Sequence, residues 1–300
     1  MSAAFSLLFS HLGAAECDYR AARAVELVTQ GHLNPAGVLI LGAGDRLEGV
    51  FVCQPTAGAG ALVWPPIVRT AQPEVAEDAL VQAGCAWLAG QGTRLAQCLL
   101  ATNEMNLAPP LLRQGFVHVT GLTYLRHDLR PGLLPATPTH HLRFHPYDAD
   151  HPERFHRTLE RTYEQSLDCP EVNGLRSVAE VIRGHQAHGH HDPSWWWLAE
   201  LDGDPVGVLL LTEASLGEWE VGYMGVVPQA RRRGVGSAML TQALTRVQAI
   251  GGVQVVLCVD DRNRPARQLY VQLGFEPHDH REVLLNTRIG LSLSQSGLNG

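Results

Sequence analysis

Alternation of hydrophobic and polar positions predicts a series of strands in the second half of the chain. Residues 195–201 and 206–214 are two strongly apolar runs separated by DGDP, and an Asp-Gly pair tolerates the positive φ that a tight hairpin turn requires. Residues 217–228 form a third such run. VQVVLCV (253–259) is almost continuously apolar, as expected for a strand buried on both faces.

Helical periodicity fills the intervals between and around these strands. Helices are predicted near 151–165, near 177–187 and over 264–273, and a last strand over 281–288. A further helix opens with RRRGVGSAM (231–239). Its apolar residues fall on one face, and they are Met239, Leu240, Ala243, Leu244 and Val247.

The first half of the chain repeats this order in outline. Its predicted elements are a helix (18–29), strands (36–42, 48–55 and 60–66), a helix (74–88), a strand (94–101), a short helix and a last strand region (115–129). The endings LLRQGF and YVQLGF also match. We interpret the chain as an internal duplication. RPGLLPATP (130–138) reads as a linker, which gives two domains, 1–135 and 136–300.

Composition narrows the classes of function. The chain has 300 residues, and 30 acidic against 23 basic residues leave a net charge of −7, which disfavours nucleic acid as a partner. Six cysteines are scattered without C-x-x-C spacing, as in a reducing cytosol. The first residues carry neither a signal-peptide nor a membrane-anchor pattern. We therefore expect a cytoplasmic protein without a membrane partner, and the sequence carries no signal of its oligomeric state.

The stretch RRRGVG, at the start of a predicted helix, is a candidate binding site for an anion. The first N–H groups of a helix lack intrahelical partners, and the macrodipole adds partial positive charge there. Gly234 and Gly236 would let a ligand approach the main chain, and Arg231, Arg232 and Arg233 could add charge for a diphosphate. An arginine-rich helix cap with a solvated face is the alternative for this stretch alone.

Two sequence motifs make the second half resemble the GNAT superfamily of N-acetyltransferases. The family's phosphate turn, Gln/Arg-x-x-Gly-x-Gly/Ala, is met by 231–236, and the pattern Asn263-x-x-Ala266-x-x-x-Tyr270-x-x-x-Gly274-Phe275 follows it. The resemblance implies an α/β fold of two tandem GNAT-like domains, each a mixed, mostly antiparallel central sheet flanked by helices. It also implies acetyl-CoA as the acyl donor.

The same resemblance implies which residues hold acetyl-CoA. Main-chain groups of Met224 and Val226 would bind the pantetheine arm, and Asn263 would touch the arm from the other side. N–H groups near the turn would hold the pyrophosphate, those of Arg232, Arg233, Gly234, Gly236 and Ser237.

Two residues could carry acid–base chemistry for acyl transfer to an amine. Tyr270 follows Asn263 by two helical turns, and a phenol of reference pKa about 10 stays protonated at neutral pH and can donate to a departing thiolate. Glu220 matches the general-base glutamate of some family members, and burial beside apolar neighbours would raise its basicity. Glu218, on the same strand face, and water remain alternative bases.

The acceptor is expected to be the primary amine of a small molecule. It would enter over SLDCPEVNG (166–174), where Asp168, Glu171 and Asn173 could bind a cationic or polar group, or could simply be solvated. HQAHGHHD (185–192) has no distant partner cluster, so no metal site is expected.

The first half lacks the corresponding signals. Its helix start has prolines and no Gly-x-Gly, and Leu111 and Glu104 occupy the places of Tyr270 and Asn263. We therefore expect a degenerate first copy and a catalytic second copy that acts as an N-acyltransferase. The rival hypotheses are a non-catalytic acetyl-CoA sensor or scaffold and a nucleotide-binding module.

Overall fold

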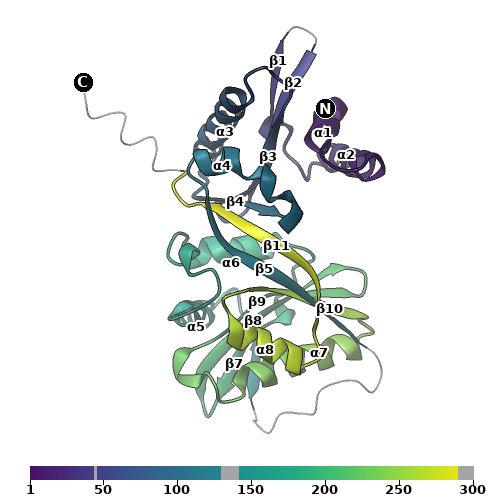
Figure 1. Ribbon diagram of the computed structural model, residues 1–300. Helices are drawn as coiled ribbons and strands as arrows, with labels where there is room; N and C mark the ends of the chain where they lie inside the picture. The colour runs from purple at the N-terminus through teal and green to yellow at the C-terminus, as the bar shows by residue number, and fades with distance from the viewer. Residues whose placement is uncertain (44–45, 130–141, 290–300) are drawn as a thin grey trace, which may run out of the picture. The chain divides into compact units, whose positions relative to one another are not determined.

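A computed structural model describes residues 1–43, 46–129 and 142–289 of the chain. Strands and helices alternate through this part, which confirms the α/β class (Figure 1). No helix in these three ranges is long and apolar enough to cross a membrane. The predicted linker at 130–138, and with it the predicted boundary after residue 135, lies outside the described residues.

The chain divides into two compact units, and the first consists of Met1–Val119 together with the segment from Glu282 onward. Its helices are α1 (Ser2–Leu8), α2 (Ala14–Thr29), α3 (Pro73–Gly90) and α4 (Pro109–Arg113), and its complete strands are β1 (Val38–Ala43), β2 (Arg46–Thr56), β3 (Gly60–Val68) and β4 (Leu95–Leu100). The strands lie in the order β1-β2-β3-β4, followed by the end of β11 (Glu276–Asn286). Only β3 and β4 pair in parallel among these described strands.

Helices cover both faces of the sheet in this first unit. α3 packs Leu80, Val81 and Leu88 on a core that includes Phe51 of β2. Gly84 of α3 permits this approach, since a Cβ there would lie 2.4 Å from Cε1 of Phe51. The other face is covered by α2 and by α1, a short helix that the sequence pattern did not predict.

The second unit consists of Thr120–Arg281. Its helices are α5 (Glu153–Tyr163), α6 (Val178–Gln186), α7 (Val235–Ala249) and α8 (Arg264–Gln272), and its strands are β5 (Val117–Asp128), β6 (Arg143–Pro146), β7 (Trp196–Leu201), β8 (Asp204–Ser215), β9 (Glu218–Val226) and β10 (Gln254–Asp260). The strand order is β5-β10-β9-β8-β7-β6, with β9 and β10 parallel and the other described pairs antiparallel. The predicted hairpin between β7 and β8 is confirmed, and Asp202 and Gly203 both have positive φ.

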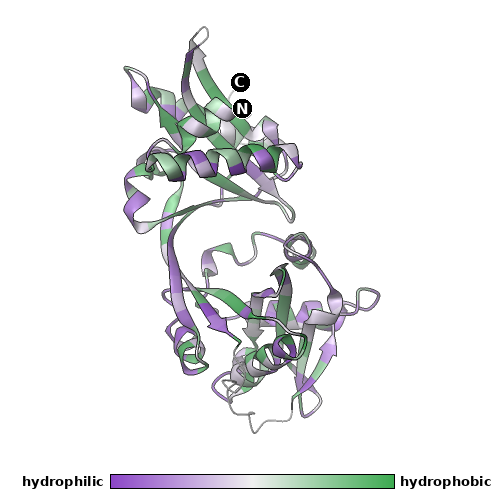
Figure 2. Cartoon of the chain, turned by 90° about the vertical axis from the view of Figure 1, so that its right-hand side faces the viewer, coloured by the Kyte–Doolittle hydropathy of each residue, from purple (hydrophilic) through white to green (hydrophobic). Residues whose placement is uncertain are grey.

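Helices also flank this second sheet on both faces. The apolar face of α7, including Met239 and Leu244, packs against Trp219, Val255 and Leu257 of the sheet. On the opposite face, α5 and α6 cover a separate cluster that contains Trp196 and Leu210. Figure 2 shows hydrophobic stretches along the strands and hydrophobic and hydrophilic residues alternating along the helices. The predicted periodicity therefore corresponds to real burial.

Strands β5 and β11 do not follow a simple division of the chain into consecutive halves. β5, from the first half of the sequence, pairs with β10 from Gln254↔Asp128 to Asp260↔Leu122. β11, the last strand, pairs with β4 from Glu282↔Leu100 to Asn286↔Ala96. Each compact unit therefore contains a strand segment from the opposite half of the sequence. The central strands β4 and β10 both gain a second neighbour in this way, which satisfies their main-chain groups.

Candidate functional site

The strands β9 and β10 pair for only three residues and then separate. The register runs Gln254↔Glu218, Val255↔Trp219 and Val256↔Glu220, whereas β9 continues to Val226 and β10 to Asp260. No further pairing joins the described residues of these two strands. Main-chain groups along 221–226 and 257–260 consequently border an opening in the middle of the sheet. Those that have no partner within the chain can bind a ligand there, but the Val226 carbonyl accepts from Arg231 and the Asp260 N–H donates to Asp168.

A β-bulge in β9 changes which face of the sheet its side chains point to. β8 and β9 are in register at Leu211↔Val221 and again at Leu210↔Tyr223, so Gly222 is the extra residue. Before the bulge, Trp219 and Val221 face the core under α7, but after it Tyr223 faces the α5 and α6 side. Met224 and Val226, predicted to bind a pantetheine arm, are half-buried on the part of β9 that borders the opening.

The N-terminus of α7 follows β9 and has the form expected for an anion site. Gly234 is its N-cap in the left-handed conformation (φ 79°), and no side chain caps the helix. The N–H of Ala238 donates to the carbonyl of Gly234 at 3.0 Å. No described residue accepts a hydrogen bond from the N–H groups of Gly234, Gly236 or Ser237. Arg232 and Arg233 are exposed beside them, so this end of the helix presents donors and positive charge.

The guanidinium of Arg231 has a different place from the one that the sequence suggests. It donates to four carbonyl oxygens, those of Val226 (2.9 Å), Gln165 (3.1 Å), Thr162 (3.0 Å) and Glu164 (2.7 Å). This side chain therefore joins the end of α5 to the end of β9. The structure gives it a structural role, which the sequence pattern alone did not reveal.

Replacing Arg231 with alanine is expected to destabilise the protein by about 2 kcal/mol, because two half-buried and two exposed carbonyls lose a charged donor. The affinity for acetyl-CoA should change less than it does on replacement of Arg232 and Arg233 by alanine. Chemical denaturation and isothermal calorimetry would measure the two effects. A normal stability with a lost coenzyme affinity would contradict this structural role.

Tyr270 lies on α8 within the core under the sheet, with 7% of its surface exposed. Burial, with smaller contributions from Asp168 and Cys258, raises the pKa of its phenol. The hydroxyl has no hydrogen-bond partner among the described residues, so it is protonated and able to donate. Asn263 is the N-cap of the same helix, and its side chain accepts from the N–H of Ala266 at 3.3 Å.

Glu220 points to the opposite face of β9 from Trp219, and its carboxylate is paired with a histidine. The Oε2 atom lies 2.8 Å from Nε2 of His188, which comes from the loop after α6. The hydrogen bond to Glu220 raises the pKa of His188. Glu218, the alternative base, lies at the start of β9 and accepts from the Ser215 hydroxyl at 3.3 Å in the preceding turn. Glu220 is therefore the carboxylate at the point where the strands separate.

Asp260, at the end of β10, organises the loop that was predicted to admit the acceptor. Its fully buried carboxylate accepts from the Thr120 hydroxyl (2.7 Å), the Cys169 N–H (3.0 Å) and the side chain of Arg262 (2.7 Å). Arg262 in turn makes a two-pronged pair with Glu171 at 2.6 and 2.9 Å. The carboxylate of Glu171 is thus neutralised within the chain, which weakens its predicted role in acceptor binding.

Asp168 and Asn173 complete the account of that loop. The Oδ1 atom of Asp168 accepts from the N–H of Asp260 at 3.0 Å, and burial raises its pKa. Asn173 follows the short helix Pro170–Val172, and its N–H donates to the carbonyl of Pro170. The loop is therefore fixed to the end of β10, beside the opening.

Lowering the pH from about 4 to about 2 is expected to destabilise the protein through Asp260. Burial alone would raise the pKa of this carboxyl, but hydrogen bonds from Arg262, Thr120 and Cys169 outweigh burial and lower the pKa to about 2. Because the folded pKa lies below the unfolded one, the stabilisation is present above pH 4 and is lost toward pH 2. Thermal unfolding at several pH values would show the loss, which should be smaller in Asp260→Asn. Exposed Asp204→Asn should behave as wild type, and identical acid profiles for all three proteins would contradict this assignment.

Three residues near the opening were missed by the sequence analysis. His188 is one of several histidines that the sequence does not distinguish. Cys258 of β10 stands opposite Tyr124 of β5, and desolvation by the surrounding protein raises the pKa of both groups to about 12. Glu220 also raises both pKa values. The apolar run 253–259 contained Cys258, but pairing with β5 could not be foreseen.

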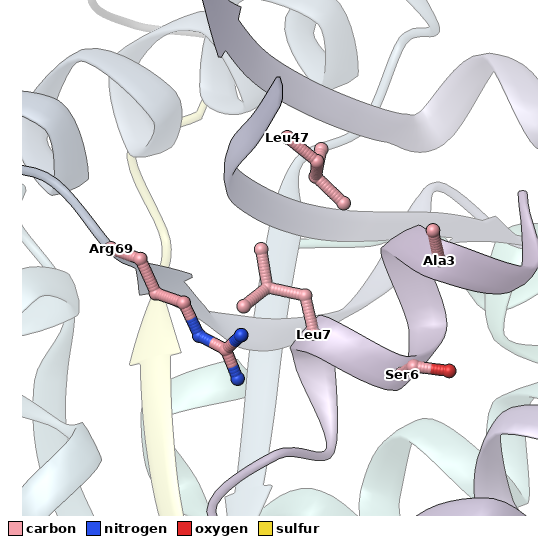
Figure 3. A pocket seen from close by; sticks show the side chains of 5 residues that line it. All are labelled: Ala3, Ser6, Leu7, Leu47 and Arg69. Atoms are coloured by element: carbon pink, nitrogen blue, oxygen red, sulfur yellow. The ribbon is translucent and has the colours of Figure 1, made fainter. Parts of the chain in front are cut away.

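The first unit also contains two parallel strands that separate, but it lacks residues equivalent to Tyr270 and Asn263. β3 and β4 pair in parallel from Gly60↔Leu95 to Leu62↔Gln97 and then separate. Leu111 is fully buried in the core, and Glu104 caps a 3-10 helix by accepting from the N–H of Ala101. A cavity of about 450 Å³ lies elsewhere in this unit, where side chains from α1, Leu47 and Arg69 converge (Figure 3). Its lining holds one cation and no acid–base pair.

Comparison with known proteins shows what this part of the chain is similar to. Residues 154–275 match the family model described as Acetyltransferase (GNAT) family. A mycothiol acetyltransferase of Beutenbergia cavernae is 38% identical over 104 residues, which are 33% of this chain and 34% of that protein. The match thus spans about a third of the curated relative.

Two solved structures extend the likeness over most of the chain. A GCN5-related N-acetyltransferase from Sphaerobacter thermophilus has a TM-score of 0.60 at 18% identity, with 88% of this chain and 84% of that chain covered. A tandem GNAT protein from the clavulanic acid biosynthesis pathway has a TM-score of 0.51 at 14% identity, with 95% and 93% covered. These likenesses concern the fold, and they confirm the expected tandem GNAT architecture.

Proposed function

The chain contains a GNAT acetyltransferase domain at residues 154–275, and from this premise we propose that it is an N-acyltransferase. It would move the acetyl group of acetyl-CoA to a primary amine of a small molecule by direct attack in a ternary complex. One observation supports the proposal: the parallel strands β9 and β10 separate directly after Glu220, and Tyr270 of α8 has a buried phenol without a hydrogen-bond partner among the described residues.

Acetyl-CoA fits the groups that border the opening. The N–H groups of Arg232, Arg233, Gly234, Gly236 and Ser237 would hold the pyrophosphate, with the exposed guanidinium groups of the two arginines adding charge. Main-chain groups of Met224 and Val226 would bind the pantetheine arm, with the Val226 carbonyl already accepting a hydrogen bond from Arg231. Asn263, at the start of α8, would contact the arm from the other side.

The chain's residues can account for each proton in the transfer. Glu220 removes a proton from the acceptor ammonium, and the neutral amine attacks the thioester carbonyl carbon. The C–N bond forms, the C–S bond breaks, and the Tyr270 phenol protonates the departing thiolate. The second amine proton leaves to solvent through the base and a further proton restores Tyr270, so that amide, thiol and one released proton are the products. Positioning of amine and thioester supplies most of the acceleration.

The acceptor is proposed to be a small, polar amine. Relatives that match about a third of the chain are named mycothiol acetyltransferases, so an amine precursor of a mycothiol-type thiol is the first acceptor to assay. The net charge of −7 argues against nucleic acid. We also propose the cytoplasm as the compartment, in keeping with six unpaired cysteines.

A screen of amines for release of free coenzyme A thiol tests this function. We expect at least one polar amine to give turnover that depends on Glu220 and Tyr270. Acetyl-CoA binding without thiol release across the panel would favour the sensor or scaffold hypothesis. ATP displacing acetyl-CoA in a thermal-shift titration would favour a nucleotide-binding module.

A further inference from the structure

The loop that carries His188 is fixed against β8 beside Glu220. The N–H of His190 donates to the carbonyl of Glu213 at 3.0 Å, and these residues form an isolated antiparallel bridge. Gly189 has a positive φ of 62°, and a Cβ there would lie 2.6 Å from Cγ2 of Thr212. Thr212 is the β8 partner of Glu220 in the sheet register. The loop therefore lies over Thr212, the strand neighbour of Glu220, and places His188 within hydrogen-bonding distance of Glu220.

In the Glu220–His188 pair, the histidine is the side chain more exposed to solvent. The Glu220 side chain is 29% exposed and the His188 side chain 59% exposed, with 2.8 Å between Oε2 and Nε2. The Nδ1 atom of His188 has no hydrogen-bond partner among the described residues. One ring nitrogen thus contacts the carboxylate, and the other can exchange a proton with water.

We propose that His188 is a positioning residue of the acid–base centre, which orients Glu220 and passes to solvent the proton that Glu220 removes from the acceptor amine. This inference rests on the proposed function and deepens it. The proton moves from the ammonium to the Glu220 carboxylate. The carboxyl then protonates Nε2 of His188 through Oε2, the oxygen 2.8 Å from it, when the imidazole carries its own proton on Nδ1. Loss of a proton from Nδ1 to water returns a neutral imidazole and a carboxylate.

The charged and titratable groups that face the pair are consistent with this relay. His185, on α6, is half-buried, and desolvation, together with Arg176 and His188, lowers its pKa to about 4, so it is neutral at pH 7. Tyr124 and Cys258, on β5 and β10, have raised pKa values of about 12 and are also neutral. The hydrogen bond to Glu220 raises the pKa of His188, and an imidazole can both take and release a proton.

Two substitutions of His188 separate the relay from simple orientation. His188→Gln keeps a hydrogen-bond donor for Glu220 but cannot take up a proton, and His188→Ala removes both functions. We expect both to lower kcat by about 10- to 100-fold with a small change in KM for acetyl-CoA. Added imidazole should partly restore His188→Ala and leave wild type unchanged. His190→Gln, whose exposed side chain is two residues away in the same loop, is the matched control and should retain wild-type turnover.

The result that overturns the inference is a His188→Gln protein as fast as wild type, or a His188→Ala protein that imidazole does not restore. Histidine ring titration by NMR provides a readout independent of turnover. The pKa of His188 should fall in Glu220→Gln, and an unchanged titration would also overturn the pairing. Wild-type protein that releases no thiol with any amine would instead refute the proposed function, and the NMR titration would still decide whether the pair exists.

Discussion

Replacing Tyr270 with phenylalanine is expected to lower kcat about 100-fold and to leave the dissociation constant for acetyl-CoA nearly unchanged. The phenol is buried and unpartnered among the described residues, and burial raises its pKa, so it stays protonated at neutral pH and has a proton to give to the departing thiolate. Phenylalanine retains the ring that packs against Phe275. Steady-state kinetics and calorimetry together would separate loss of the acid from loss of binding.

Tyr147→Phe is the matched control for that substitution. Its hydroxyl contacts Nε2 of His156 at 3.2 Å within the cluster under α5, away from the strands that separate. The same loss of one hydroxyl should leave kcat at the wild-type value. Full turnover by Tyr270→Phe would show that another group or water protonates the thiolate.

Replacing Gly234 with valine is expected to weaken acetyl-CoA binding by about 10- to 100-fold. The residue has φ 79° at the N-cap of α7, where a β-branched side chain costs about 1–3 kcal/mol of strain and shields the N–H groups that would meet the pyrophosphate. Isothermal calorimetry with acetyl-CoA measures the change. The same experiment with dephospho-CoA should show a similar loss, because the pyrophosphate is common to both ligands.

Gly251→Val separates backbone strain from ligand contact. Gly251 lies just beyond the other end of α7, with φ 84°, and a Cβ at this residue would have no other atom within 4 Å. The substitution introduces comparable strain at the same helix, so its melting temperature should fall as in Gly234→Val while its coenzyme affinity stays at the wild-type value. Equal losses of affinity in both variants would place the pyrophosphate elsewhere.

The parts of the fold that depend on local sequence could be predicted. Alternating apolar runs indicated the strands around the hairpin at Asp202, and one apolar face indicated α7, because burial of a strand or helix face leaves a direct periodicity. The turn 231–236 was recognisable for the same reason, since glycines and a helix start are adjacent in the chain. The repeated order of elements indicated the tandem architecture that the solved structures confirm.

The parts that depend on contacts between distant segments could not be predicted. The pairing of β5 with β10 joins residues more than a hundred positions apart, and no local pattern of apolar residues specifies it. The hydrogen bonds that Arg231 donates depend on where α5 ends. The pairing of Glu220 with His188 depends on the bridge between His190 and Glu213. In the last two cases the role of the side chain follows from the neighbour that the tertiary fold brings to it.

The position of β5 has a practical consequence for dissecting the protein. A fragment beginning at residue 136 would retain the acetyltransferase segment but leave β10 with an open edge, where seven residue pairs with β5 now lie. Unsatisfied main-chain groups beside an apolar strand invite association between copies, so such a fragment should be recovered as aggregates. The two halves of the sequence should therefore be expressed together, because each supplies a strand to the sheet of the other.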